Sequence, residues 1–322
     1  MNRTANWSES LELNIDKWIK ERWEQFPNYI PMFCNVQNTN LGLVRHQASA
    51  GIGLVPQVTE GAPTPDTDYT KAYQTIYIPK SYRINVPVTW EEYEDDQYSI
   101  FQDRAGELAD AGMRTANIYA ASILMNSQST SYTSYGDGNP LGSTSHERAD
   151  GGANQSNASS TNIALSEPNI FTGIRTLRTQ KNDAGQRFMV AENKIRLTIP
   201  GALEKLAQEV IRSDGKSGGF TNDLNYYEGV MANALILPWI GSGDQALFTG
   251  SDTRFMLTPE SSGMGVRNFL TFLWRQQPQY STWIDDRTKS YNMDVFMRFA
   301  YGWSHWLGTW ITAGTGTGSY TD

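Results

Sequence analysis

The stretch that most constrains the fold of this chain is residues 98–128, which contain no proline. Apolar and small side chains recur there at steps of three and four, which places them on one face of an α-helix. A helix of this length is roughly 40 Å long and crosses a whole domain. The pattern predicts a central helix, called the spine helix below; the alternative is an ordinary core helix of an α+β enzyme. The residues that carry the pattern are Phe101, Ala105, Leu108, Gly112, Thr115, Tyr119 and Ile123.

The composition excludes several classes of protein. With 322 residues, 12% aromatic residues and ten tryptophans, the chain is long and apolar enough to bury a sizeable core and commonly divides into two domains. Its net charge of −8 argues against a surface that grips nucleic acid through phosphate contacts. A single cysteine, Cys34, excludes an internal disulfide, fits a reducing compartment, and is expected to be a small buried apolar residue.

Nothing in the sequence predicts a targeting or membrane segment. The first ten residues lack the apolar core of a signal peptide, and the longest apolar run, residues 234–240, is too short to span a bilayer and contains Pro238. We therefore expect a soluble chain with no membrane partner.

The first ninety residues predict a helix followed by strands. Residues 9–26 are amphipathic, and Trp18 and Trp23 can pack on the chain's own core or anchor an arm on a neighbouring copy. Residues 82–90 alternate apolar and polar around Pro87, which is typical of an edge strand. Residues 42–58 and 69–79 flank a proline-rich, acidic turn and are expected to pair as a long hairpin. Because an isolated hairpin is marginal in water, we expect it to lie on another copy of the chain.

Five acidic residues precede the spine helix: Glu91, Glu92, Glu94, Asp95 and Asp96. Paired carboxylates are what a glycoside hydrolase or a calcium site requires. The start of a helix also favours acids, and no calcium-loop spacing is present. We therefore interpret the run as a solvated face, with a soluble hydrolase as the alternative.

The region after the spine helix is rich in turns and then alternates helix and strand. Residues 127–161 carry strong turn signals, and His146, with no second ligand nearby, is expected to be a structural histidine. Residues 164–181 predict a helix capped by Ser166. The glycine-rich loop 213–220 lacks the spacing of a phosphate-binding loop. Further predictions are a strand at 194–200, a helix at 202–212, short strands at 230–239, 245–249 and 254–257, and aromatic strands within 268–312 that pack on the spine helix.

These elements, taken in order, resemble the major capsid proteins of tailed double-stranded DNA bacteriophages. The resemblance rests on the sequence GDGNPLGSTSH at 136–146, on LSEPNIFTGIRTLRTQKNDAGQ at 165–186, and on Ile199 and Pro200 before an ALEKLA helix. Within that group the chain resembles the head subunits of Mu-like phages, although Gly142 stands where a phenylalanine is usual.

The resemblance implies an α+β fold of the Hong Kong ninety-seven type. The implied organisation is an N-terminal arm at 1–36, an extended hairpin loop at 37–77, a peripheral domain at 78–187 and 265–322 with the spine helix at 98–126, and an axial domain at 188–264. Loops 213–220 or 241–244 would then form the axial tips.

The resemblance also implies a mechanical function. Pentamers and hexamers of the chain would form an icosahedral head shell in the virion, assembled in the host cytoplasm around double-stranded DNA that is bound without sequence specificity. A separate scaffolding protein, a portal and decoration proteins are the expected partners. No catalytic residue, cofactor or metal is expected, and Lys71 and Lys80 are treated as ordinary surface lysines rather than cross-linking sites. An encapsulin-like compartment is the alternative with the same fold. Candidate interface residues are Trp18, Trp23, Arg45, Glu60, Asp66, Lys80, Lys216 and Asp244.

Overall fold

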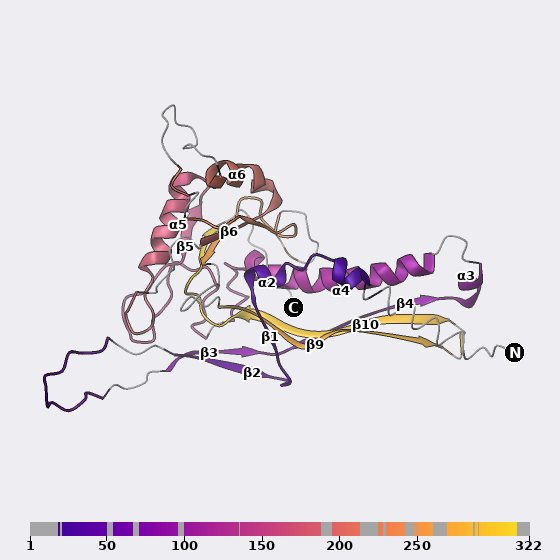
Figure 1. Cartoon of the computed structure of the whole chain (residues 1–322), viewed down its shortest axis with the longest axis horizontal. Helices are drawn as coiled ribbons and strands as arrows, with labels where there is room; N and C mark the ends of the chain where they lie inside the picture. Colours follow the sequence, from indigo (N-terminus) through magenta and orange to yellow (C-terminus); the bar gives the residue numbers. More distant parts are fainter. Residues whose placement is uncertain are drawn as a thin grey trace.

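The computed structural model describes residues 19, 21–49, 54–66, 71–95, 100–134, 136–187, 195–212, 225–227, 230–241, 248, 250–259, 269–285, 287–288 and 290–313. Figure 1 shows a long helix, α4, lying along one sheet, a second sheet with two helices standing at one end of it, and a hairpin projecting away. No helix in the described part of the chain is long and apolar enough to span a membrane.

The spine helix is α4 (Ile100–Met125), which confirms the predicted central helix. Its inner face is made of small residues, and Ala105, Ala109 and Ala116 have no exposed surface. A methyl group on Gly112 would already lie 3.4 Å from Val295 on the sheet, so the helix and the sheet approach closely there. The residues just before it, 96–99, lie outside the described part.

The spine helix covers a four-stranded sheet of order β1-β9-β10-β4. The strands are β1 (Asn35–Asn38), β9 (Leu270–Ile284), β10 (Tyr291–Trp303) and β4 (Lys80–Val88). Strands β9, β10 and β4 are antiparallel, and β1 runs parallel to β9. Strand β4 lies at the edge of the sheet, as Pro87 predicts. Proline has no backbone N–H to donate to a neighbouring strand, so it is tolerated mainly in edge strands. The short helix α2 (Ile30–Phe33) precedes β1.

One boundary of β4 differs from the prediction. Trp90 does not continue the strand but begins a short helix, α3 (Trp90–Glu94). Thr89 has extended backbone and its hydroxyl accepts the Glu92 N–H at 3.3 Å, an N-cap that ends the strand and starts the helix. Glu91, Glu92 and Glu94 therefore belong to α3 and Asp95 follows it, whereas Asp96 lies outside the described residues.

Aromatic side chains of β9 and β10 fill the first core beneath the spine helix. Phe272, Phe299 and Trp303 have no exposed surface, and Tyr119 of the helix packs edge-on against Phe299 with ring centroids 5.9 Å apart. This confirms that the aromatic band forms a core. Cys34 is buried in the same core, where burial raises the pKa of its thiol.

The second sheet has the order β5-β11-β8-β6-β7. Its strands are β5 (Ala158–Asn162), β11 (Trp310–Ala313), β8 (Met256–Pro259), β6 (Ile195–Ile199) and β7 (Leu235–Ile236). Helix α5 (Glu167–Thr179), the turn η1 (Gly201–Leu203) and helix α6 (Glu204–Arg212) accompany it and confirm the predicted helices. The predicted strand at 230–239 is reduced to β7, and the strand predicted to begin at Arg254 begins at Met256.

This second core draws on both sides of the predicted domain boundary at residue 188. Ile170 and Ile174 of α5 and Trp310 of β11 share one buried cluster with Leu197 of β6 and Ile211 of α6. The division into peripheral and axial domains remains a prediction from the resemblance.

The predicted hairpin is present. Strand β2 (Val44–Ser49) pairs antiparallel with β3 (Lys71–Tyr77), with Val44 opposite Tyr77 and Ser49 opposite Lys71. The pairing is shorter than predicted, and residues 54–66 form the described part of its tip.

Gly173 of α5 allows the helix to lie directly on the second sheet. A methyl group there would come within 2.5 Å of Leu257 Cδ1 and 2.6 Å of Trp310 Cε3. Replacing Gly173 with alanine is expected to lower the free energy of unfolding by about 1–3 kcal/mol, because overpacking outweighs the gain in helix propensity. Urea unfolding of the variant checks this, with Thr172→Ala on the exposed face as the control. Equal or greater stability of Gly173→Ala would contradict the close packing.

Candidate assembly interface

The tip of the β2–β3 hairpin carries apolar side chains with almost no contact to their own chain. Leu54 is 87% exposed and Val55 is 93% exposed, and every other residue of 54–66 is exposed as well. Burying one such side chain typically contributes about 1.5–3 kcal/mol. Two neighbouring aliphatic side chains left in water at the end of a projecting arm indicate a surface that becomes covered in an assembly.

The base of this hairpin is fixed on the first sheet. Thr75 and Tyr77 of β3 are buried, and Tyr77 clusters with Leu273 of β9 and Ala300 of β10. Burial raises the pKa of the Tyr77 hydroxyl, and the His46 ring packs edge-on against Tyr77 at 5.3 Å. Gly136 lies so close to the hairpin that a methyl group would come within 2.7 Å of the Gln74 carbonyl oxygen. The arm is therefore held at its base, and its tip is exposed to solvent.

Further exposed apolar side chains lie toward the end of the first sheet that is next to α3. They are Ile84 (51% exposed), Trp90 (41%), Trp283 (43%) and Ile284 (40%), and are together called the sheet end below. Trp283 and Ile284 are consecutive on β9 and therefore point to opposite faces of the sheet. Figure 1 shows α3 and this end of β4, β9 and β10 at the opposite end of the long axis from the hairpin tip. One copy cannot bring its own tip to its own sheet end.

The predicted interface residues are dispersed rather than gathered at one site. Glu60 and Asp66 are exposed in the tip, Arg45 is exposed on β2, and Lys80 is exposed at the start of β4. Trp18, Lys216 and Asp244 lie outside the described residues.

Trp23 packs on its own chain. Its ring lies edge-on to Tyr280 of β9 at 6.1 Å. The neighbouring Arg22 donates from Nε and Nη2 to the Asp110 carboxylate of the spine helix at 3.0–3.2 Å. These contacts dock residues 21–25 on the first core of the same subunit.

Sequence reasoning missed the exposed apolar residues of this proposed interface, Leu54, Val55 and those of the sheet end. The available signal was a pair of aliphatic residues inside a proline-rich turn, a place where burial in the same chain is uncommon.

The acidic run does not form a catalytic pair among the side chains that the structure describes. Arg104 of the spine helix binds Glu92 at 2.5 Å, whereas Glu91 and Asp95 are exposed. Within the described part of the chain, no group of three His, Cys, Asp or Glu residues is placed to hold a metal ion.

His146 is a structural histidine, as predicted. It is 1% exposed, stacks on Trp306 with ring centroids 4.5 Å apart, and lies 2.7 Å from Asp137 Oδ2 through Nδ1. Asn157 Oδ1 accepts the Ser143 N–H at 2.9 Å and lies 3.1 Å from His146 Nε2. Because that amide oxygen is an acceptor, Nε2 of His146 carries a proton. This network joins the 136–157 segment to the loop between β10 and β11.

A second buried histidine, His305, pairs with Asp183, and this pair predicts that the stability of the fold decreases in acid. His305 Nδ1 accepts the Leu307 N–H at 3.1 Å, so Nε2 donates to Asp183 Oδ2 at 3.3 Å. Burial alone would raise the pKa of Asp183. The hydrogen bond and charge of His305, the amide of Ala149 and the charge of Arg148 outweigh it and lower that pKa. Such a carboxylate stabilises the fold above its unfolded pKa of about 3.9, and this contribution is lost as pH falls through the folded pKa.

Replacing Asp183 with asparagine is therefore expected to cost about 1–3 kcal/mol of stability at neutral pH and to flatten the loss of stability below about pH 4. Urea unfolding across this pH range measures both effects. Exposed Asp66→Asn serves as the control and should leave the profile unchanged. An unaltered acid profile in Asp183→Asn would contradict the assignment.

Comparison with known proteins gives the class to which this fold and these surfaces belong. A family model described as phage capsid protein matches residues 72–312. A search of curated protein sequences found no significant match. Among solved structures, the chain resembles the capsid of cyanophage P-SCSP1u, with 12% identity, a TM-score of 0.55, and 90% and 89% of the two chains covered. It is similar to the Ralstonia phage GP4 capsid, at 13% identity, a TM-score of 0.55, and 88% and 86% coverage. The capsid of an empty GTA particle has 9% identity, a TM-score of 0.53 and 90% coverage of both chains.

The chain belongs to the phage capsid protein family. It is a major capsid protein with the α+β fold of phage shells, a structural protein of the virion. The resemblance stated from the sequence is confirmed at this level, and its assignment to the Mu-like group remains a prediction. The comparisons give no support to an encapsulin-like compartment or a hydrolase.

Proposed function

We propose that the chain assembles into pentamers and hexamers that close into an icosahedral shell around double-stranded DNA. The observation that carries this proposal is the pair Leu54 and Val55, exposed at the tip of an arm whose base is fixed on the subunit core. In a family of shell proteins, such an arm supplies a contact that only another copy can complete.

The surface that receives the tip is proposed to be the sheet end of a neighbouring copy. Ile84, Trp283 and Ile284 there are half-exposed apolar side chains, which match the aliphatic residues of the tip. Because tip and sheet end lie at opposite ends of one subunit, the contact joins two different patches and propagates from copy to copy. Closure of such head-to-tail contacts gives rings.

The charge of the chain suits a container better than a DNA-binding protein. A net charge of −8 lets a shell enclose DNA without holding it through phosphate contacts. We propose that the chain has no enzymatic activity, that it assembles in the host cytoplasm, and that a scaffolding protein, a portal and decoration proteins complete the head.

Sedimentation of the purified chain, alone and with a co-expressed scaffold candidate, tests the proposal. Negative-stain microscopy of any fast fraction should show closed shells tens of nanometres across. A compact monomer in every condition would overturn it. DNA inside shells isolated from infected cells would separate a genome container from an empty compartment.

A further inference from the structure

The spine helix ends without a basic residue of its own. The last turn of α4 contains no lysine, arginine or histidine. The final carbonyl groups of a helix have no partner within it and carry the negative end of the helix dipole. A cation at this end must come from another part of the chain.

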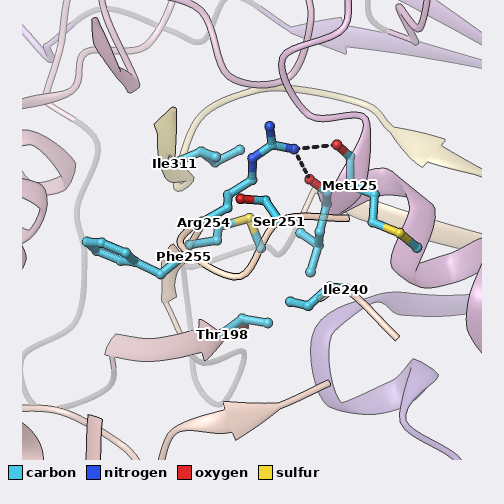
Figure 2. Close-up of a pocket in the computed structure, with 9 residues that line it drawn as sticks. Met125, Thr198, Ile240, Ser251, Arg254, Phe255 and Ile311 are labelled. Atoms are coloured by element: carbon cyan, nitrogen blue, oxygen red, sulfur yellow. Dashed lines mark hydrogen bonds between the residues drawn. The ribbon is translucent and has the colours of Figure 1, made fainter. Parts of the chain in front are cut away.

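Arg254 supplies that cation from the second sheet. Its Nη1 donates to the Met125 carbonyl oxygen, and it lies 3.4 Å from the Leu124 carbonyl oxygen. Figure 2 shows the guanidinium reaching the end of the helix above a small pocket lined by Thr198, Ile240 and Ser251. The residue is only 8% exposed, and burial lowers the pKa of its guanidinium.

The backbone of Arg254 lies just before β8 and is held there through the residue that follows it. The next residue, Phe255, donates its N–H to Thr312 Oγ1 at 2.9 Å and accepts the Thr312 N–H at 3.1 Å. The residues that precede Arg254 are also tightly packed, because a methyl group on Gly250 would lie 2.0 Å from the Gly241 carbonyl oxygen. The arginine thus joins the two parts of the subunit. Its backbone is held beside the second sheet, and its guanidinium contacts the last carbonyl groups of the spine helix.

Most other contacts between the end of the spine helix and the second sheet are apolar. Leu124 and Met125 of the helix pack in one cluster with Met256 of β8, Ile311 of β11 and Ile240, which follows β7. Apolar contact is non-directional, so it permits a small rotation of one unit against the other. A planar guanidinium that donates to carbonyl groups fixes both the distance and the orientation of the helix end relative to the arginine.

We propose that Arg254 is a clamp that sets the angle between the spine helix and the second sheet, and that this angle sets the curvature of the shell. The inference rests on the proposed shell. A shell of one diameter requires a narrow range of this angle among its copies, because small differences between copies accumulate around each ring. Without the Arg254 contact, we expect the subunit to keep both cores, but the angle between the spine helix and the second sheet varies from copy to copy.

Arg254→Met tests the clamp, because methionine keeps the apolar volume and removes both charge and donors. The expected result is a folded subunit, by circular dichroism, whose assemblies lose the single diameter of the parent in electron micrographs. Arg212→Met is the matched control: Arg212 ends α6, and its Nη2 donates to Asn233 Oδ1 beside the same sheet, so within the described part of the chain it makes no bond to the spine helix side. It should give parental shells.

Shells of Arg254→Met with the parental diameter distribution would overturn the clamp and leave the shell function standing. Failure of the parent itself to form shells would instead overturn the proposed function. If Arg254→Met does not fold, Arg254→Lys takes its place, because lysine keeps the charge and loses the planar fork. A broadened distribution then supports the clamp, and an unchanged one overturns it.

Discussion

Replacing Leu54 and Val55 together with aspartate is expected to abolish the formation of closed shells. Both side chains are almost fully exposed in the subunit, so the substitution removes no contact within the chain. In an assembled contact the same positions would bury two unpaired carboxylates, which costs several kcal/mol at each contact. Because every copy repeats the contact, the cost multiplies over the shell.

The measurement is sedimentation velocity followed by negative-stain microscopy, under conditions in which the parent assembles. The variant should sediment as a slow species with an unchanged circular dichroism spectrum. Its free energy of unfolding should stay within about 0.5 kcal/mol of the parent, as for other surface substitutions.

The matched control exchanges the two aliphatic residues, Leu54→Val with Val55→Leu. It keeps the apolar surface and should assemble as the parent does. Shells of normal size and yield from the aspartate variant would contradict a role for the tip in assembly and would direct attention to the sheet end alone.

Long periodic elements were predictable from the sequence because their pattern is local. The spine helix and α5 follow the helical period, and β4 follows strict alternation with Pro87 marking an edge. The hairpin was also predictable, since its two strands flank an obvious turn. In each case the residues that decide the structure are near one another in the chain.

The remaining features depend on partners that are distant in sequence. The bond from Arg254 to Met125 joins residues 129 positions apart. Strand β1, with the polar sequence NVQN, has little strand character of its own and pairs because β9 offers a parallel edge. Helix α5 joins the second core because Gly173 lets it approach Trp310. No local pattern contains these contacts.

The interface was the least predictable part for a related reason. Exposed aliphatic residues such as Leu54 and Val55 become informative only once the fold shows that no described part of the subunit covers them. Charged candidates such as Glu60 and Lys80 carry no such signal, because charged residues are exposed on contact surfaces and on ordinary solvated surfaces alike.

Replacing Phe299 with alanine is expected to lower the free energy of unfolding by about 3–5 kcal/mol, a large share of the stability of most domains. Phe299 has no exposed surface and lies at the centre of the first core. Its ring stacks on Tyr82 at 4.3 Å and on Phe272 at 5.0 Å, and it contacts Tyr119 of the spine helix at 5.9 Å. Three elements therefore lose packing at one position.

Urea unfolding of the unassembled subunit measures this cost, with Phe171→Ala as the matched control. Phe171 lies on α5 and is 50% exposed, so its loss should change stability far less. Comparable effects of the two substitutions would contradict the central position of Phe299. If the Phe299 variant is too unstable to purify, Phe299→Leu, which leaves a smaller cavity, should fall between the alanine variant and the parent. That order of stabilities would show that the packing around Phe299 holds the spine helix on β10.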